Sequence, residues 1–143
     1  MESGTWTWFD HTADIGLEVA APSLESLFST AAHALFDLLI EPTADRQPSC
    51  LMKRVIEIDA NNPPELLVRW LAELLYIHET SSMVLTRVHI RELSDDRIAG
   101  DVLWEPFDRS RHRLRREIKG VTYHQVCVEQ QPAGWRARLV LDV

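Results

Sequence analysis

The chain has 143 residues, of which 45% are hydrophobic and 26% charged, and its formal net charge is −7. These proportions are typical of a folded globular protein and exclude a disordered, collagen-like or coiled-coil chain. The length indicates a single domain over residues 1–143, large enough to bury a core without metal ions or disulfides.

Several sequence features argue against membrane insertion or export. No apolar run approaches the roughly 20 residues of a membrane-spanning helix. The first residues lack the basic start and the apolar stretch of a secretory signal. The two cysteines, Cys50 and Cys127, form no CxxC motif, so we expect reduced thiols. Together these features predict a cytoplasmic protein that does not associate with a membrane.

Charge is distributed unevenly along the chain. Residues 1–80 carry a net charge of −9, whereas residues 81–143 carry +2. The acidic total makes non-specific binding to nucleic acid improbable, because phosphates would be repelled. The one basic cluster contains Arg109, Arg111, Arg113, Arg115, Arg116 and Lys119. It is either a solvated loop whose arginines pair with nearby acids or a docking surface for an acidic partner or RNA.

The first half of the chain predicts strands and two helices. Alternating apolar and polar residues predict two short strands, followed by a helix that Ser23 caps, a third strand and a helix that Asn62 caps. Glu41 and Pro42 end the first helix, and Glu65 completes the capping of the second. In order, the predicted ranges are 5–9, 16–20, 23–41, 52–59 and 62–81.

The second half predicts two strand pairs separated by a polar segment. Residues 94–96 form a hairpin-length turn, and residues 130–134 form a second turn. Within the polar segment 105–119, residues 111–119 are expected to make one or two helical turns. The predicted strands are 84–91, 98–104, 123–129 and 135–143. Because hairpin-length connections produce antiparallel pairs, we predict an α+β fold. Its expected form is a two-layer sandwich in which two amphipathic helices cover one face of a mostly antiparallel sheet.

Common enzyme motifs are absent. The sequence contains no GxGxxG, GxxxxGK[ST], HExxH or GxSxG motif, and neither cysteine has metal-ligand spacing. A nucleophile with a dedicated base cannot be named.

Two polar features remain as candidate sites. Residues 10–14 place two carboxylates, an imidazole and a hydroxyl between strands, and Asp14 could ligate a hard cation. The alternative is an ordinary turn in which Asp10 bonds its own backbone. At the other end, Asp142 lies beside the terminal carboxylate of Val143, and two such groups repel unless a cation lies between them. The alternative there is a solvated strand end.

Taken together, several segments resemble the archease family. The resemblance extends over nearly the whole chain and is specific because the segments occur in the family's order and spacing. The matching segments are residues 10–16, 23–28, 34–38, 65–76, 117–124 and 141–143. Small differences are Gly120, where the family usually has alanine, and an unusually arginine-rich segment before Lys119.

The resemblance implies a function that residue patterns do not reveal. Archeases activate a GTP-dependent RNA ligase that joins ends bearing a 3′-phosphate or a 2′,3′-cyclic phosphate, in tRNA splicing and RNA repair. They promote guanylylation of the ligase and so allow multiple turnover. The expected partner is therefore this ligase, with tRNA or other RNA ends reached through it, and the protein itself is not an enzyme.

The resemblance also implies site residues. The metal ligands correspond to Asp14, Asp142 and the terminal carboxylate of Val143, with calcium expected and magnesium or manganese as alternatives. Lys119 corresponds to a functional lysine whose chemical role is open. His11 is expected to orient Asp14, with Asp10 nearby.

Two other functions remain open. One is a stand-alone metal-dependent phosphoesterase that uses the same carboxylates. The other is a binding or chaperone-like module that contacts RNA or protein through the basic cluster between Arg109 and Lys119.

Overall fold

The computed structural model describes residues 4–11, 13–41 and 50–143. Two helices and nine strands lie within this part of the chain. In chain order they are β1 (Thr5–His11), β2 (Asp14–Ala21), α1 (Leu24–Leu39), β3 (Ile40–Glu41), β4 (Met52–Asp59), α2 (Pro63–Ser81), β5 (Met83–Leu93), β6 (Arg97–Pro106), β7 (Arg113–Leu114), β8 (Gly120–Gln131) and β9 (Gly134–Asp142).

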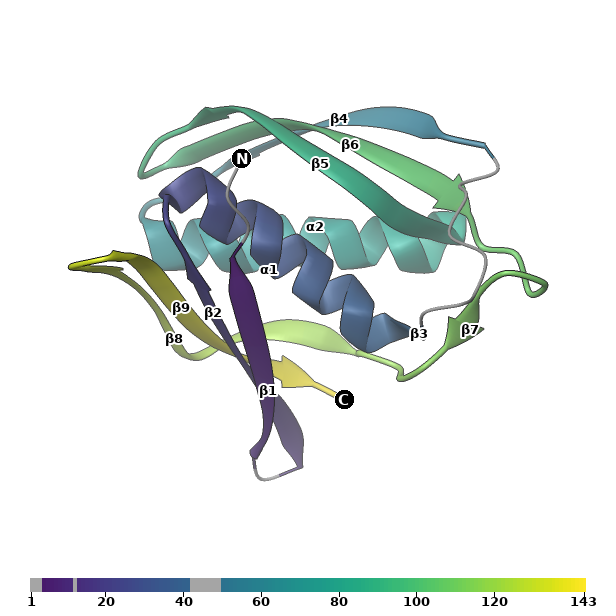
Figure 1. Cartoon of the computed structure of the whole chain (residues 1–143), viewed down its shortest axis with the longest axis horizontal. Helices are drawn as coiled ribbons and strands as arrows, with labels where there is room; N and C mark the ends of the chain where they lie inside the picture. Colours follow the sequence, from purple (N-terminus) through teal and green to yellow (C-terminus); the bar gives the residue numbers. More distant parts are fainter. Residues whose placement is uncertain (1–3, 12, 42–49) are drawn as a thin grey trace.

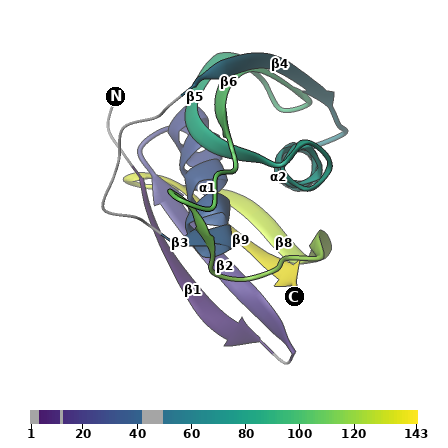
Figure 2. The same cartoon turned by 90° about the vertical axis from the view of Figure 1, so that its right-hand side faces the viewer.

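The two helices lie between two antiparallel sheets (Figures 1 and 2). One sheet has the strand order β1-β2-β9-β8, the other has the order β4-β6-β5, and β3 pairs with β7 alone. Helix α1 contacts β2 and β9 on one side and β5 on the other, and α2 contacts β8 as well as β4, β5 and β6. The predicted α+β class and antiparallel pairing are confirmed, but the strands form two main sheets, so the layers number three.

Burial of α1 explains the additional layer. Ser23 caps the helix by accepting a hydrogen bond from the Ser26 backbone N–H at 3.1 Å. Eleven of the 16 helical residues are buried, including small residues such as Ala31, Ala32 and Ala34. A helix that is apolar on nearly all sides cannot leave one face in water, so it needs a cover on both sides. The prediction of two amphipathic helices on one face of a sheet assumes one apolar side per helix, so it does not include the second sheet.

Helix α2 is fixed at its ends and at its centre. The Glu65 backbone N–H donates to the Asn62 side chain at 2.9 Å, and Ser82 ends the helix in a left-handed conformation with φ 52°. The Trp70 side chain is completely buried, and its indole N–H donates to the Phe28 carbonyl of α1 at 3.1 Å. This bond joins the two helices inside the core.

Strand β2 lies between β1 and β9 and shows two different faces. Ile15, Leu17 and Val19 are buried against the helices. Each pairs with a residue of β9 that is also buried, and these partners are Leu141, Leu139 and Ala137. Because side chains alternate, Asp14 and Glu18 lie on the opposite, outer face of the sheet.

The polar segment before β8 differs from its prediction. Residues 111–119 make no helical turns, and Arg113–Leu114 instead form β7, paired with β3. The Arg115 backbone N–H donates to the Leu39 carbonyl at 2.8 Å, which ties the segment to the end of α1. Backbone pairing with another part of the chain thus replaces the local hydrogen bonds of a helix. Neither helix within the described residues is long and apolar enough to cross a membrane.

We predict that Trp70→Phe lowers the free energy of unfolding by about 1–3 kcal/mol. The substitution removes the donor to the buried Phe28 carbonyl and leaves a small cavity. Chemical denaturation would measure the change. Tyr76→Phe on the same helix is the matched control, since Tyr76 is 61% exposed, and should change stability by less than about 0.5 kcal/mol. Equal stability of the two variants would contradict the role of the Trp70 bond.

Candidate metal and lysine site

Strand register brings the two predicted carboxylates together. Asp14 at the start of β2 pairs directly with Asp142 near the end of β9. Residues opposite each other in an antiparallel pair project from the same face, with Cβ atoms about 5 Å apart. The sequence separates these residues by nearly the whole chain, so the fold unites the two candidate sites predicted separately.

The backbone of Lys119 lies next to the pair of Asp14 and Asp142. Its N–H donates to the Asp142 carbonyl at 2.7 Å, and the next residue, Gly120, pairs with Asp142 across β8 and β9. The Lys119 residue is exposed. The hydrogen bond therefore holds the backbone in place while leaving the ammonium group in contact with solvent.

The remaining residues of the predicted group lie on two faces. His11 pairs with Asp14 across β1 and β2, but its side chain lies outside the described part of the structure. Asp10 pairs with Ile15, whose side chain is buried against the core. Alternation therefore places Asp10 on the inner face and Asp14 on the outer face. The fold separates Asp10 from the two carboxylates that it brings together.

Basic side chains on the outer face have other partners. Arg136 forms an ion pair with Glu18, and the Arg138 guanidinium lies 4.6 Å from the centroid of the Phe9 ring. Within the described residues, neither Asp14 nor Asp142 forms an ion pair. Two carboxylates at this spacing repel each other unless a cation compensates them.

These donors fit a hard cation, although side chains alone do not complete a site. Oxygen ligands suit Ca²⁺, Mg²⁺ and Mn²⁺. Among the residues that the structure describes, no group of three His, Cys, Asp or Glu side chains could hold a metal ion. Asp14 and Asp142 would therefore need at least one further ligand.

Lys119 also lines an open pocket of about 520 Å³. The pocket lies between the end of α2 and the segment before β8. The other lining residues are Leu39, His78, Glu79, Leu114, Arg116, Glu117 and Ile118. The His78 ring meets the Met83 carbonyl through Nδ1 at 2.7 Å, which fixes the ring orientation. The pocket thus presents two basic side chains, Arg116 and Lys119, near the strand end that carries Asp142.

The arginine cluster divides into a buried anchor and exposed residues. Arg111 donates to Glu105 at 3.1 Å, and their side chains are only 13% and 7% exposed. Arg111 is therefore mostly buried and paired with an acid. This agrees with the first of the two predictions for the basic cluster, in which its arginines pair with nearby acids. The exposed members are Arg109, Arg113, Arg115 and Arg116.

His112 completes the anchor at Glu105. Its Nδ1 accepts a hydrogen bond from the Asp108 backbone N–H at 3.0 Å, so Nε2 carries the proton that is donated to Glu105 at 2.5 Å. Hydrogen bonds from the Ser110 backbone N–H and hydroxyl hold the pKa of Asp108 below its ordinary value. Sequence analysis missed this cluster because Glu105 and His112 carry no recognisable motif.

Comparison with known proteins identifies the family. Residues 6–143 match the model of the archease protein family (MTH1598/TM1083). The chain belongs to the archease family. It is 34% identical to protein archease of Methanopyrus kandleri, covering 96% of this chain and 99% of the relative. It is 33% identical to protein archease of Pyrococcus furiosus, with coverage of 96% and 98%.

Solved structures share the archease fold. Protein 1598 of Methanobacterium thermoautotrophicum, solved in solution, superposes with a TM-score of 0.72 at 29% identity, covering 96% of this chain and 98% of that one. A Thermotoga maritima protein described as an archease and possible chaperone superposes with a TM-score of 0.59 at 18% identity, covering 94% of each chain. The match to the family model and the identity to the two relatives confirm the predicted family.

We predict that Glu105→Gln lowers the free energy of unfolding by about 3 kcal/mol, because it leaves the guanidinium of Arg111 buried without a carboxylate. Thermal or denaturant unfolding would measure the loss. The control is Glu57→Gln, since Glu57 is 56% exposed in its pair with Arg97 and the change should cost less than about 1 kcal/mol. A loss at Glu105 no larger than that at Glu57 would show that the cluster does not anchor the segment.

Proposed function

We propose that this archease is a cytoplasmic accessory protein that activates a GTP-dependent RNA ligase. The ligase would join RNA ends bearing a 3′-phosphate or a 2′,3′-cyclic phosphate, in tRNA splicing and RNA repair. The archease would promote guanylylation of the ligase and hence multiple turnover, acting as a single domain over residues 1–143. The observation that carries the proposal is the pairing of Asp14 with Asp142 beside the backbone of Lys119.

Asp14, Asp142 and the terminal carboxylate of Val143 are the proposed metal ligands. A divalent ion, with Ca²⁺ preferred over Mg²⁺ or Mn²⁺, would supply positive charge that offsets carboxylate repulsion and attracts phosphate oxygens. The protein contributes rigidity, because both aspartates lie on paired strands whose inner faces are buried. His11, paired with Asp14, is proposed to orient that carboxylate.

Lys119 is the proposed contact with phosphate. An ammonium group is a compact cation that binds phosphate oxygens as a point charge. The bond from its backbone N–H to the Asp142 carbonyl holds the Lys119 backbone beside the carboxylate pair. Because Lys119 is exposed, its side chain can contact a phosphate group that the ligase supplies.

The alternatives use the same residues differently. In a stand-alone phosphoesterase, the purified protein would hydrolyse phosphodiesters without the ligase. In a binding or chaperone-like module, the exposed arginines Arg109, Arg113, Arg115 and Arg116 would dominate, and the carboxylates would be dispensable.

We predict that the protein raises turnover of its cognate ligase and that Asp14→Asn and Lys119→Ala each remove most of this gain. Asp14→Asn keeps the side-chain shape but removes the charge, and Lys119→Ala removes the cation. Multiple-turnover ligation and formation of the guanylylated ligase would both be measured. We expect a loss of at least about tenfold, equivalent to about 1.4 kcal/mol.

Matched controls exist in the chain. Lys53 is the only other lysine and lies exposed on β4 of the opposite sheet, so Lys53→Ala should retain stimulation. Asp95→Asn, in the exposed turn between β5 and β6, should also retain it. If wild-type protein leaves an active ligase unstimulated, the activator proposal fails. If stimulation of the ligase is lost only when the charge of the exposed arginines is reversed, the binding module is favoured.

We predict that Ca²⁺ raises the melting temperature of the isolated protein and that Asp14→Asn and Asp142→Asn abolish the shift. A ligand present at about 100 times its Kd stabilises a protein by about 2.7 kcal/mol. Differential scanning calorimetry with Ca²⁺, Mg²⁺ or Mn²⁺ would measure this effect. Adding one alanine after Val143 moves the terminal carboxylate by up to about 3.8 Å and should weaken the shift. Retention of the full shift in Asp14→Asn would place any bound ion elsewhere.

A further inference from the structure

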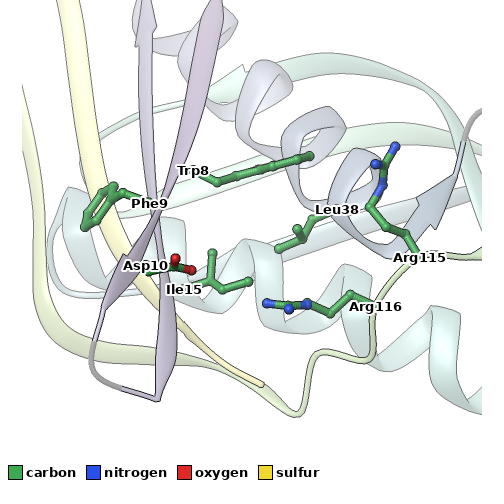
Figure 3. A pocket seen from close by; sticks show the side chains of 7 residues that line it. All are labelled: Trp8, Phe9, Asp10, Ile15, Leu38, Arg115 and Arg116. Carbon is green, nitrogen blue, oxygen red and sulfur yellow. The ribbon is translucent and has the colours of Figure 1, made fainter.

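A second open pocket, of about 480 Å³, lies between the end of β1 and the segment after β7 (Figure 3). Its volume falls within the range of small-molecule sites, roughly 300–1,000 Å³. The lining residues are Trp8, Phe9, Asp10, Ile15, Leu38, Arg115 and Arg116. The residues proposed for ligase activation, Asp14, Asp142 and Lys119, do not line it.

The pocket exists because β1 extends beyond the helix that covers the sheet. Trp8 and Asp10 lie on the inner face of β1, opposite Leu17 and Ile15 of β2. Helix α1 ends at Leu39, so its last turn contributes Leu38 to the floor. Asp10 then occupies a position on the core-facing side that no helix covers.

Opposite charges line this pocket without neutralising each other. In Figure 3, the Arg116 side chain extends from the segment after β7 toward the strands that carry Asp10 and Ile15. No ion pair between Arg116 and Asp10 occurs within the described part of the chain. A guanidinium and a carboxylate that face one space without meeting can bind opposite ends of one ligand.

Aromatic groups supply the third feature. The Arg115 guanidinium lies 5.9 Å from the centroid of the Trp8 ring, and its Nε donates to the Asp37 carbonyl at 3.0 Å. The Trp8 indole N–H is buried and has no hydrogen-bond partner within the described residues. A buried donor without an acceptor is unfavourable.

We propose that this pocket binds a nucleotide whose base carries an exocyclic amino group. Arg115 and Arg116 bind the phosphate, the aromatic and apolar lining of Trp8, Ile15 and Leu38 receives the flat base, and Asp10 accepts hydrogen bonds from the amino group. Aromatic rings and arginines are the usual surfaces on which unpaired bases stack, and a carboxylate accepts from an exocyclic amine. Inorganic phosphate alone would leave the apolar floor and Asp10 unused. The inference does not depend on ligase activation.

The test is isothermal titration calorimetry of the full chain with matched ligands. GMP and inosine 5′-monophosphate differ only in the 2-amino group, and CMP has a 4-amino group where UMP has a 4-carbonyl and a protonated N3. We expect GMP and CMP to bind more tightly than their partners, and Asp10→Asn to remove both preferences. Arg116→Gln should weaken GMP binding about tenfold, with a smaller effect at high salt. Arg109→Gln, an exposed arginine outside the pocket, is the control.

Other outcomes would overturn the proposal. It fails if inorganic phosphate binds as tightly as GMP, if an acidic peptide binds and no nucleotide does, or if Arg109→Gln weakens binding as much as Arg116→Gln. A six-nucleotide single-stranded RNA distinguishes two sources of the same ligand. Tighter binding of the RNA than of GMP identifies an unpaired nucleotide within a strand, and the reverse order identifies a free nucleotide, provided that Arg116→Gln weakens both.

Discussion

The pairing of β2 with β9 is the constraint on which both the core and the carboxylate pair depend. Leu17 opposite Leu139 belongs to the buried side of this ladder, and Asp14 opposite Asp142 belongs to its outer side. A shift of one residue would turn the apolar set to solvent, so burial fixes the register strongly. The alignment of the two aspartates is therefore maintained by apolar packing on the opposite face of the same strands.

In the segment before β8, buried contacts hold the backbone while basic side chains remain exposed. Helix α1 fills the space between the sheets, and its last turn receives the backbone of Arg115. Glu105 holds Arg111 and His112 on the far side of the same segment. These contacts hold the chain at Arg111, His112 and Arg115, while Arg116 and Lys119 remain on the surface. Rigid backbone with free cationic side chains is an arrangement suited to recognising phosphate.

How much the sequence could predict depended on whether the signal was local. The caps at Ser23 and Asn62 are local, and both helices begin where these residues indicate. Strand partners are not local, so the division into two sheets could not be read from alternation alone. Arg111 shows a different limit, since Glu105 lies only six residues earlier in the chain but no motif indicates that the turn between them buries the pair. The family resemblance grouped Asp14 with Asp142, which residue patterns had left as separate features.

The face on which Asp10 lies depends on where β1 ends. Alternation through Trp6 and Trp8 continues to Asp10, which puts that residue on the core-facing side of β1. From the sequence alone, residues 10–14 form one polar break between strands, which predicts that Asp10 lies near Asp14. The extension of β1 to His11 could be recognised only once its partner β2 was seen to begin at Asp14.

The strand order also constrains how the chain assembles during synthesis. Strands β1 and β2 emerge early, yet β2 finds its second neighbour in β9, the last strand of the chain. Until then, the inner face of the first hairpin has only α1 to cover it, and one edge of β2 lacks hydrogen-bond partners. Contacts between residues so distant in sequence form slowly because loop closure must precede them. In the opposite sheet, β4, β5 and β6 pair with strands that are close in the sequence. This sheet can form while the ribosome still holds the end of the chain.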